Sequence, residues 1–174
     1  MLMQMVKRII GGFFLLLLLL WLFAPKVELY YLLEKNLKKE GIIISNESLQ
    51  DTWFGLSIKN ADIYVKGANM VHINELKLNI FFFYNTLHIK TLTTDAIVHN
   101  VAPKEIEDVS ITYSILKPLK ATLKGIGSFG TVEGQVELIK KHVTVLFPVA
   151  KDIRAFKKFL TKDAKGVWKY ETNY

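Results

Sequence analysis

The first feature of the chain is an apolar run over residues 9–24, preceded by Lys7 and Arg8. As a helix with about 1.5 Å of rise per residue, it spans about 24 Å, somewhat less than a bilayer core of about 30 Å. Burial of flanking apolar residues in the interface supplies the difference. The pattern predicts a signal anchor, a single transmembrane helix over residues 1–25. The residues expected in the lipid are Ile9, Phe13, Leu16, Leu20, Trp21 and Phe23.

A cleaved signal peptide is the alternative for this segment, because it too carries positive charge before an apolar stretch. The run is long for a signal peptide, an A-x-A cleavage motif is missing, and Pro25 directly follows Ala24. These features favour an uncleaved anchor. The positive charges on its N-terminal side predict that the N-terminus stays in the cytoplasm and that the rest of the chain is exported.

Residues 26–41 predict a juxtamembrane helix, with apolar side chains at helical spacing and Gly41 at its end. The predicted apolar stripe consists of Val27, Tyr30, Tyr31, Leu33 and Leu37.

From Ile42 onward the apolar period changes from 3.6 to 2, which is typical of β-strands. About seven or eight strands follow, and their short turns favour a meander of antiparallel hairpins. In three strands the apolar positions change parity, near Asn60, Asn74 and Thr91. Such a change would turn the apolar side chains to the other face of the sheet, so we expect β-bulges at these places.

The end of the chain predicts a helix near 152–162 and a last short strand from Val167 to Tyr170. The expected fold is mainly β: an N-terminal transmembrane helix, then a curved antiparallel β-meander (a taco or half-barrel) with one or two flanking helices. The exported β-rich domain covers residues 42–174.

Such a sheet has one apolar face and few helices to cover it, and exposed apolar patches beyond a few hundred Å² are rare. The sheet therefore curls on itself, is capped by the helices, or holds a lipid or a partner. We expect curling with partial capping. Four aromatic residues in a row, from Phe81 to Tyr84, fit either the edge of the core or a rim at a membrane interface or groove mouth. The candidate groove or interface residues are Leu56, Ile58, Ile63, Val65, Leu78, Ile80, Phe82, Phe83, Tyr84, Ile111 and Tyr113.

The surplus of basic residues allows a second interpretation, in which part of the protein faces a membrane. The chain has 23 Lys and Arg residues; without Lys7 and Arg8, 21 remain against 16 Asp and Glu, a surplus of five. This surplus serves solubility or contact with anionic lipid headgroups. A basic stripe with base-reading motifs is absent from the sequence, so no nucleic-acid partner is expected. The candidate headgroup contacts are Lys157, Lys158 and Lys162.

No catalytic constellation emerges from the sequence. Cysteine is absent, and His72, His88, His99 and His142 lack partners at metal-binding spacing, although His88 and His99 could approach after folding. We therefore expect no enzyme activity, no metal and no cofactor.

The stretches from Gly55 to Ile63 and from Gly127 to Val136 resemble strands of the AsmA-like superfamily, and within it the type II secretion system protein N group. The stretch GLSIKNADI from Gly55 to Ile63 is similar to a recurring strand of that superfamily, and GSFGTVEGQV from Gly127 to Val136 is similar to its later glycine-punctuated hairpin. The plan of an anchor, a short helix and a β-meander is also similar. This chain is shorter than the familiar members and holds one sheet.

The resemblance implies a bacterial inner-membrane protein with a single pass, a cytoplasmic N-terminus and a periplasmic domain. It implies a structural or assembly component of a secretion-type machine, which binds envelope proteins, or further copies of itself, through its sheet edges. The alternative is a lipid-binding or lipid-transfer protein that uses the apolar face of its curved sheet. A groove lined by small and aliphatic residues would favour the lipid function, and one filled by its own Phe and Trp side chains would favour the structural function.

Overall fold

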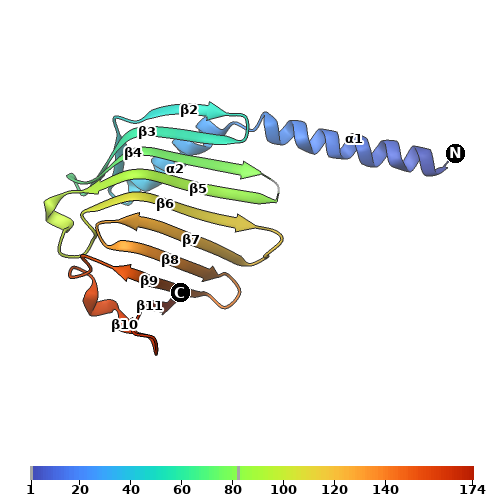
Figure 1. Cartoon of the computed structure of the whole chain (residues 1–174). Helices are drawn as coiled ribbons and strands as arrows, with labels where there is room; N and C mark the ends of the chain where they lie inside the picture. Colours follow the sequence, from blue (N-terminus) through green and yellow to red (C-terminus); the bar gives the residue numbers. More distant parts are fainter. Residues whose placement is uncertain (1, 82) are drawn as a thin grey trace.

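The computed structural model describes residues 2–81 and 83–174 and consists mainly of one open antiparallel β-sheet (Figure 1). Two α-helices precede the sheet. The elements are α1 (Leu2–Leu22), α2 (Lys26–Lys39), β1 (Ile42–Ser45), β2 (Ser48–Thr52), β3 (Gly55–Val65), β4 (Ala68–Phe81), β5 (Tyr84–Thr94), η1 (Ala96–Val98), β6 (Glu105–Ser114), β7 (Lys120–Gly127), β8 (Gly130–Glu137), β9 (His142–Ala150), η2 (Lys157–Phe159), β10 (Thr161–Lys162) and β11 (Trp168–Asn173).

The strands form the expected meander. Their order is β1-β3-β4-β5-β6-β7-β8-β9-β11-β10, and β2 also pairs with β3. The described residues contain 11 strands rather than seven or eight. One reason is that Asn46, with a φ of 64°, divides the first predicted strand into β1 and β2. Both parts lie along the same edge of β3.

A seam of irregular residues crosses β3, β4 and β5. Asn60 and Thr91 have φ angles of 56° and 50°, and no ladder pair joins either of them to Asn74. The register is the same on both sides of the seam. The interruptions therefore lie at the predicted places, but bulges were the wrong type: a bulge adds a residue to one strand, whereas here facing strands are irregular together.

The helix predicted over residues 26–41 is present as α2, which packs on β1, β2 and β3. Tyr30 is buried and donates a hydrogen bond from its hydroxyl to Glu47 at 3.2 Å. Val27 and Leu37 are half-buried on the same side, whereas Tyr31 and Leu33 are exposed, so the stripe is narrower than predicted. Together with the half-buried Glu34, the side chains on this side follow the i, i+3, i+7, i+10 spacing of one helix face.

Helix α1 extends away from the sheet (Figure 1). Within the described residues, no helix is long and apolar enough to cross a membrane.

The segment 152–162 is not the predicted helix. It contains only the short 3₁₀ helix η2 and strand β10. The backbone N–H groups of Lys151 and Asp152 donate to the carbonyl oxygens of Phe129 and Ser128, which ties the start of the segment to the β7–β8 turn. The predicted last strand is present as β11.

Candidate functional site

The apolar face of the sheet is built by cross-strand rows of aliphatic side chains. Leu56 lies opposite Leu78, which lies opposite Leu87, followed across the sheet by Ile111 and Leu123. Residues directly opposite in an antiparallel sheet share a face, so this row is continuous from β3 to β7.

A second row runs beside it, from Ile58 through Leu76 and Ile89 to Val109. Beyond the seam, Ala61 pairs with Ile73, and both are buried. A left-handed residue interrupts the alternation of the strand, and this interruption allows the apolar set on each side of Asn60 to lie on the same face.

The two ends of this face are covered by the protein itself. At the β1–β3 end, α2 packs over the sheet through Tyr30. At the β9–β11 end, the chain after β9 folds back, and its Ile153 joins Phe129, Val132 and Phe147 in a buried cluster. Phe129 and Phe147 make an edge-to-face contact with ring centroids 6.0 Å apart. Most of the buried apolar side chains lie at these two ends.

Between the two ends, the aliphatic side chains on β4, β5 and β6 are only half-buried. They belong to Leu76, Leu78, Leu87, Ile89, Val109 and Ile111. Helix α2 contacts β1, β2 and β3, and the C-terminal cluster draws on β7, β8, β9 and β11 and on Ile106 at the far end of β6. The middle of the apolar face is therefore accessible to a ligand.

Most candidate groove residues belong to this face. The two rows contain Leu56, Ile58, Leu78 and Ile111. Nearer the β4–β5 turn, Ile80 and Tyr113 lie on either side of Asn85 of β5, and each is its cross-strand partner. Ile63 and Val65 lie on β3 beyond the seam, where they pair with β1. Phe83 and Tyr84 lie apart from these rows, at the β4–β5 turn, and both are exposed. Phe82 lies outside the described residues.

The opposite face of the sheet is polar and carries charges of both signs. Lys59, Glu75, Lys90 and Asp108 alternate in sign along one cross-strand row. Charges of opposite sign placed side by side stabilise a solvated sheet face. This face is suited to solvent.

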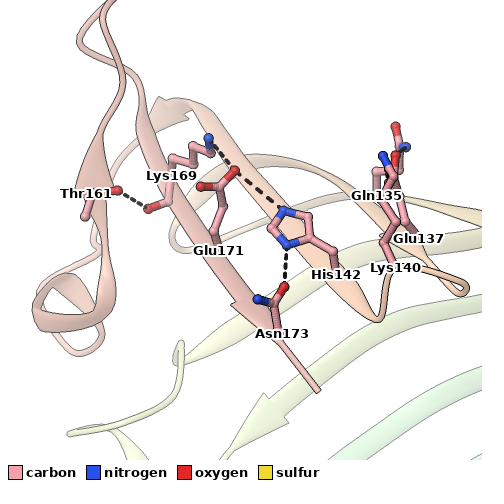
Figure 2. A network of polar contacts seen from close by, with 8 residues as sticks. All are labelled: Gln135, Glu137, Lys140, His142, Thr161, Lys169, Glu171 and Asn173. Carbon is pink, nitrogen blue, oxygen red and sulfur yellow. Dashed lines mark hydrogen bonds and ion pairs between the residues drawn. The ribbon is translucent and has the colours of Figure 1, made fainter.

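Figure 2 shows a second charged group on the polar face of β8, β9 and β11. Glu137, Lys140 and His142 of this group line a hollow of about 770 Å³. Lys120 and Lys140 donate to Glu137 at 2.9 and 2.8 Å, and these hydrogen bonds lower the pKa of the Glu137 carboxyl to about 2. Lys169 donates to Glu171 and lowers the pKa of its carboxyl. Cations thus already neutralise both carboxylates.

Three of the four histidines each contact a different polar side chain. His72 Nδ1 lies 2.6 Å from Asp62, His88 Nε2 lies 2.8 Å from Asp108, and His142 contacts Asn173 at 2.8 Å. In the part of the chain that the structure describes, no group of three or more His, Cys, Asp or Glu residues could hold a metal ion. The geometry thus directs attention to the apolar face.

Comparisons of the chain with protein-family models, curated proteins and solved structures found no match. The candidate site is therefore argued from its own geometry.

The predicted anchor residues Phe13, Leu16, Leu20 and Phe23 are exposed on or directly after α1. The side chains of Ile9 and Trp21 lie outside the described residues. The predicted headgroup lysines lie at the other end of the chain. Lys157 and Lys162 stack on the ring of Trp168 at 5.3 and 5.0 Å, and Lys158 lies over Phe159 at 4.9 Å.

Sequence reasoning missed a second apolar surface, at the hairpin turns. Large apolar side chains are exposed at the β2–β3, β4–β5, β6–β7 and β8–β9 turns, among them Trp53, Phe83, Leu116 and Ile139. The sequence contains one indication of this surface: large apolar residues stand in segments whose other residues are typical of turns. The sequence marks only the aromatic run from Phe81 to Tyr84 as unusual, because a single turn does not show which other turns lie beside it.

Proposed function

We propose that this protein is a membrane-anchored lipid-binding protein, which shelters acyl chains on the middle of its apolar sheet face. The observation that carries the proposal is the half-buried aliphatic surface on β4–β6, between α2 and the C-terminal cluster. The proposal gives the protein no catalytic role and no cofactor.

The chemistry of the surface supports an acyl chain as the occupant. The two rows that cross it consist of Leu, Ile and Val, which provide no hydrogen-bonding group. The Phe, Tyr and Trp side chains that fill the covered ends lie outside the rows. The accessible middle covers the three strands β4 to β6, which lie about 4.8 Å apart and so span about 10 Å.

The location of the protein follows from the same proposal. The apolar segment 9–24 anchors the chain in the bacterial inner membrane, and Lys7 and Arg8 keep the N-terminus in the cytoplasm. The sheet then lies in the periplasm beside the lipid from which an acyl chain would come. A curl of the sheet around this chain would increase the apolar area buried.

Native mass spectrometry of the full-length protein, purified in detergent and followed by phospholipid extraction, tests the proposal. We expect bound phospholipid, and we expect Leu87→Glu to remove most of it because the carboxylate lies in the middle of the apolar face. Thr86→Glu is the matched control, one residue earlier on the same strand and on the other face. Because both variants keep α1, lipid bound only around the anchor would be equal in the two, and that result would contradict the proposal.

A second candidate is an assembly role through the edge of the sheet. Strand β10 pairs only with Lys169 and Trp168 of β11, and it leaves the outer edge beyond Lys169 open to a further strand. The other edge is divided into the short strands β1 and β2, which makes it a poor template for strand addition. The same native mass spectra report the number of copies in each complex. A monomer would exclude self-assembly through β11.

A further inference from the structure

Four hairpin turns meet at one end of the sheet. In an antiparallel meander every second turn lies at the same end, so the β2–β3, β4–β5, β6–β7 and β8–β9 turns lie together. Figure 1 shows this end facing the side from which α1 leaves the sheet. The other turns, including η1 and the chain after β9, lie at the opposite end.

All four turns expose large apolar side chains, which we call the tip surface. The most exposed are Leu116, Trp53 and Ile139, with 88%, 76% and 73% of their surface accessible. The tip surface consists of Trp53, Phe54, Phe81, Phe83, Tyr84, Ile115, Leu116, Leu119, Leu138 and Ile139. Folding alone does not require apolar residues in solvated turns, which are usually occupied by Gly, Asn, Asp or Ser.

Contacts between neighbouring turns make the tip surface continuous. The Phe54 and Phe81 rings meet edge to face at 5.5 Å. The backbone N–H of Ile115 donates to the carbonyl of Phe83 at 3.0 Å, and that of Leu138 donates to the carbonyl of Leu119 at 2.8 Å. The turns are thus held side by side by the sheet.

Leu119 gives an independent indication that apolar residues are needed here. Its φ is 68°, in the left-handed region that disfavours a bulky L-residue, and its side chain is exposed. Gly or Asn would adopt this conformation at lower cost. Strain at an exposed position points to a function for the side chain.

The tip surface is continuous with the end of α1. Leu22 and Phe23 line a hollow of about 360 Å³ together with Trp53. Lys26, at the start of α2, forms an ion pair with Asp51 of β2 at 3.1 Å. The exit of the anchor segment and the first turn of the tip surface are therefore fixed beside each other.

We propose that the tip surface docks on a phospholipid bilayer, with its apolar side chains at the boundary between headgroups and acyl chains. Trp and Tyr are favoured at this depth, as are apolar side chains flanked by lysines. Lys117, Lys140 and Lys141 lie in the β6–β7 and β8–β9 turns and are exposed, where they meet anionic headgroups. The inference rests on the membrane association in the proposed function and adds the orientation of the sheet: its strands point at the bilayer.

Spin labels on the full-length protein test this docking. The chain has no cysteine, so single substitutions give one label each. Leu116→Cys and Ile139→Cys report on the tip surface. Ile97→Cys and Val101→Cys are matched controls, because they replace apolar residues that are 65% and 58% exposed in the loop at the opposite end. The protein is reconstituted in vesicles of phosphatidylcholine and phosphatidylglycerol, and the accessibility of each label to oxygen and to a water-soluble nickel chelate is measured.

We expect the two tip labels to favour oxygen over the nickel chelate, as labels at or below the phosphates do, and the two control labels to resemble labels in water. Four water-exposed labels on vesicle-bound protein would overturn the docking and leave lipid binding by the sheet face untouched. Protein that does not float with the vesicles would overturn the docking and the membrane association together. If the tip labels are immersed but Leu87→Glu and Thr86→Glu retain equal phospholipid, the docking stands and the lipid-binding proposal fails.

Discussion

Gly130 sits at the start of β8 in a conformation and a space that exclude a side chain. Its φ is 96°, and an added Cβ would lie 1.8 Å from the carbonyl oxygen of Val149. We expect Gly130→Ala to lower the free energy of unfolding by about 3 kcal/mol, because both the strained backbone and the collision contribute. Urea titration of the detergent-solubilised protein, followed by circular dichroism, measures this loss.

The matched control for that substitution is Gly166→Ala. Gly166 has a φ of 80° and no atom within 4 Å of the added Cβ, so only the backbone term of about 1 kcal/mol applies. Equal losses in the two variants would show that the carbonyl oxygen of Val149 does not collide with a side chain at Gly130.

Glu137 gives the sheet a dependence on pH. Its carboxyl has a pKa of about 2 in the folded protein, below the ordinary value of 4.5, because Lys140 and Lys120 donate to it. Its contribution to stability is therefore present above about pH 4.5 and is lost as the pH falls toward 2. We expect Glu137→Gln to lower the melting temperature slightly at pH 7, with a difference from the wild type that shrinks as the pH is lowered through this range.

Salt provides the control for that expectation, since exposed ion pairs are screened at high ionic strength. The difference at pH 7 should become smaller in 1 M sodium chloride. A difference that does not change with either pH or salt would mean that Glu137 acts through packing.

At the scale of elements, Tyr30 is the buried side chain by which α2 packs on the sheet, beside the Lys26–Asp51 ion pair at the start of the helix. Tyr30 is 6% exposed and bonds to Glu47, and burial of its ring together with the Glu47 charge raises the pKa of its hydroxyl. Tyr30→Ala should cost about 3 kcal/mol and release α2 from β1–β3. Urea unfolding and hydrogen exchange of the α2 amides measure the two effects.

Tyr31→Ala is the neighbouring control. Tyr31 is 54% exposed but its ring meets the Tyr30 ring edge to face at 5.7 Å, so its truncation should lower the free energy of unfolding by about 1 kcal/mol, less than that of Tyr30. Fast exchange of the α2 amides in the Tyr31 variant as well would show that the ring of Tyr30 is not the main attachment.

The elements also show what sequence patterns can predict. Alternation of apolar residues predicted the meander, and the parity change at Asn60 and Thr91 located the seam, because one face of the sheet must stay apolar. The same local pattern could not distinguish a bulge from paired irregularities, since that depends on the facing strand. The helix expected after Asp152 is absent. Ile153 and Phe156 have helical spacing, but both side chains pack on Phe147 and its neighbours, and this packing overrides the local helical preference.

The candidate site was predictable in part for the same reason. The alternation in β3, β4 and β6 predicts that Leu56, Leu78 and Ile111 share one face, and the strand pairing confirms it. The tip surface was not predicted, because it depends on which turns share an end of the sheet. Trp53 and Ile139 are far apart in the sequence and are brought to one end only by the topology.

At the scale of the whole molecule, the two proposed surfaces meet. Ile80 belongs to the apolar face and lies next to the β4–β5 turn, whereas Val65 lies on β3 at the opposite end, before the β3–β4 turn. If the tip surface faces the bilayer, an acyl chain enters the sheet face past Ile80. A negative charge at this entrance should hinder entry, and a charge at Val65 should not.

We therefore expect Ile80→Glu to reduce acyl-chain contact with β5 and β6 several-fold, while Val65→Glu leaves most of it. Full-length variants in vesicles that contain a phospholipid with a photoreactive acyl chain provide the measurement, with crosslinked peptides identified by mass spectrometry. Circular dichroism verifies that each variant is folded. Equal crosslinking in the two variants would mean that lipid reaches the face from its side, and the strands then need not point at the membrane for the sheet to bind lipid.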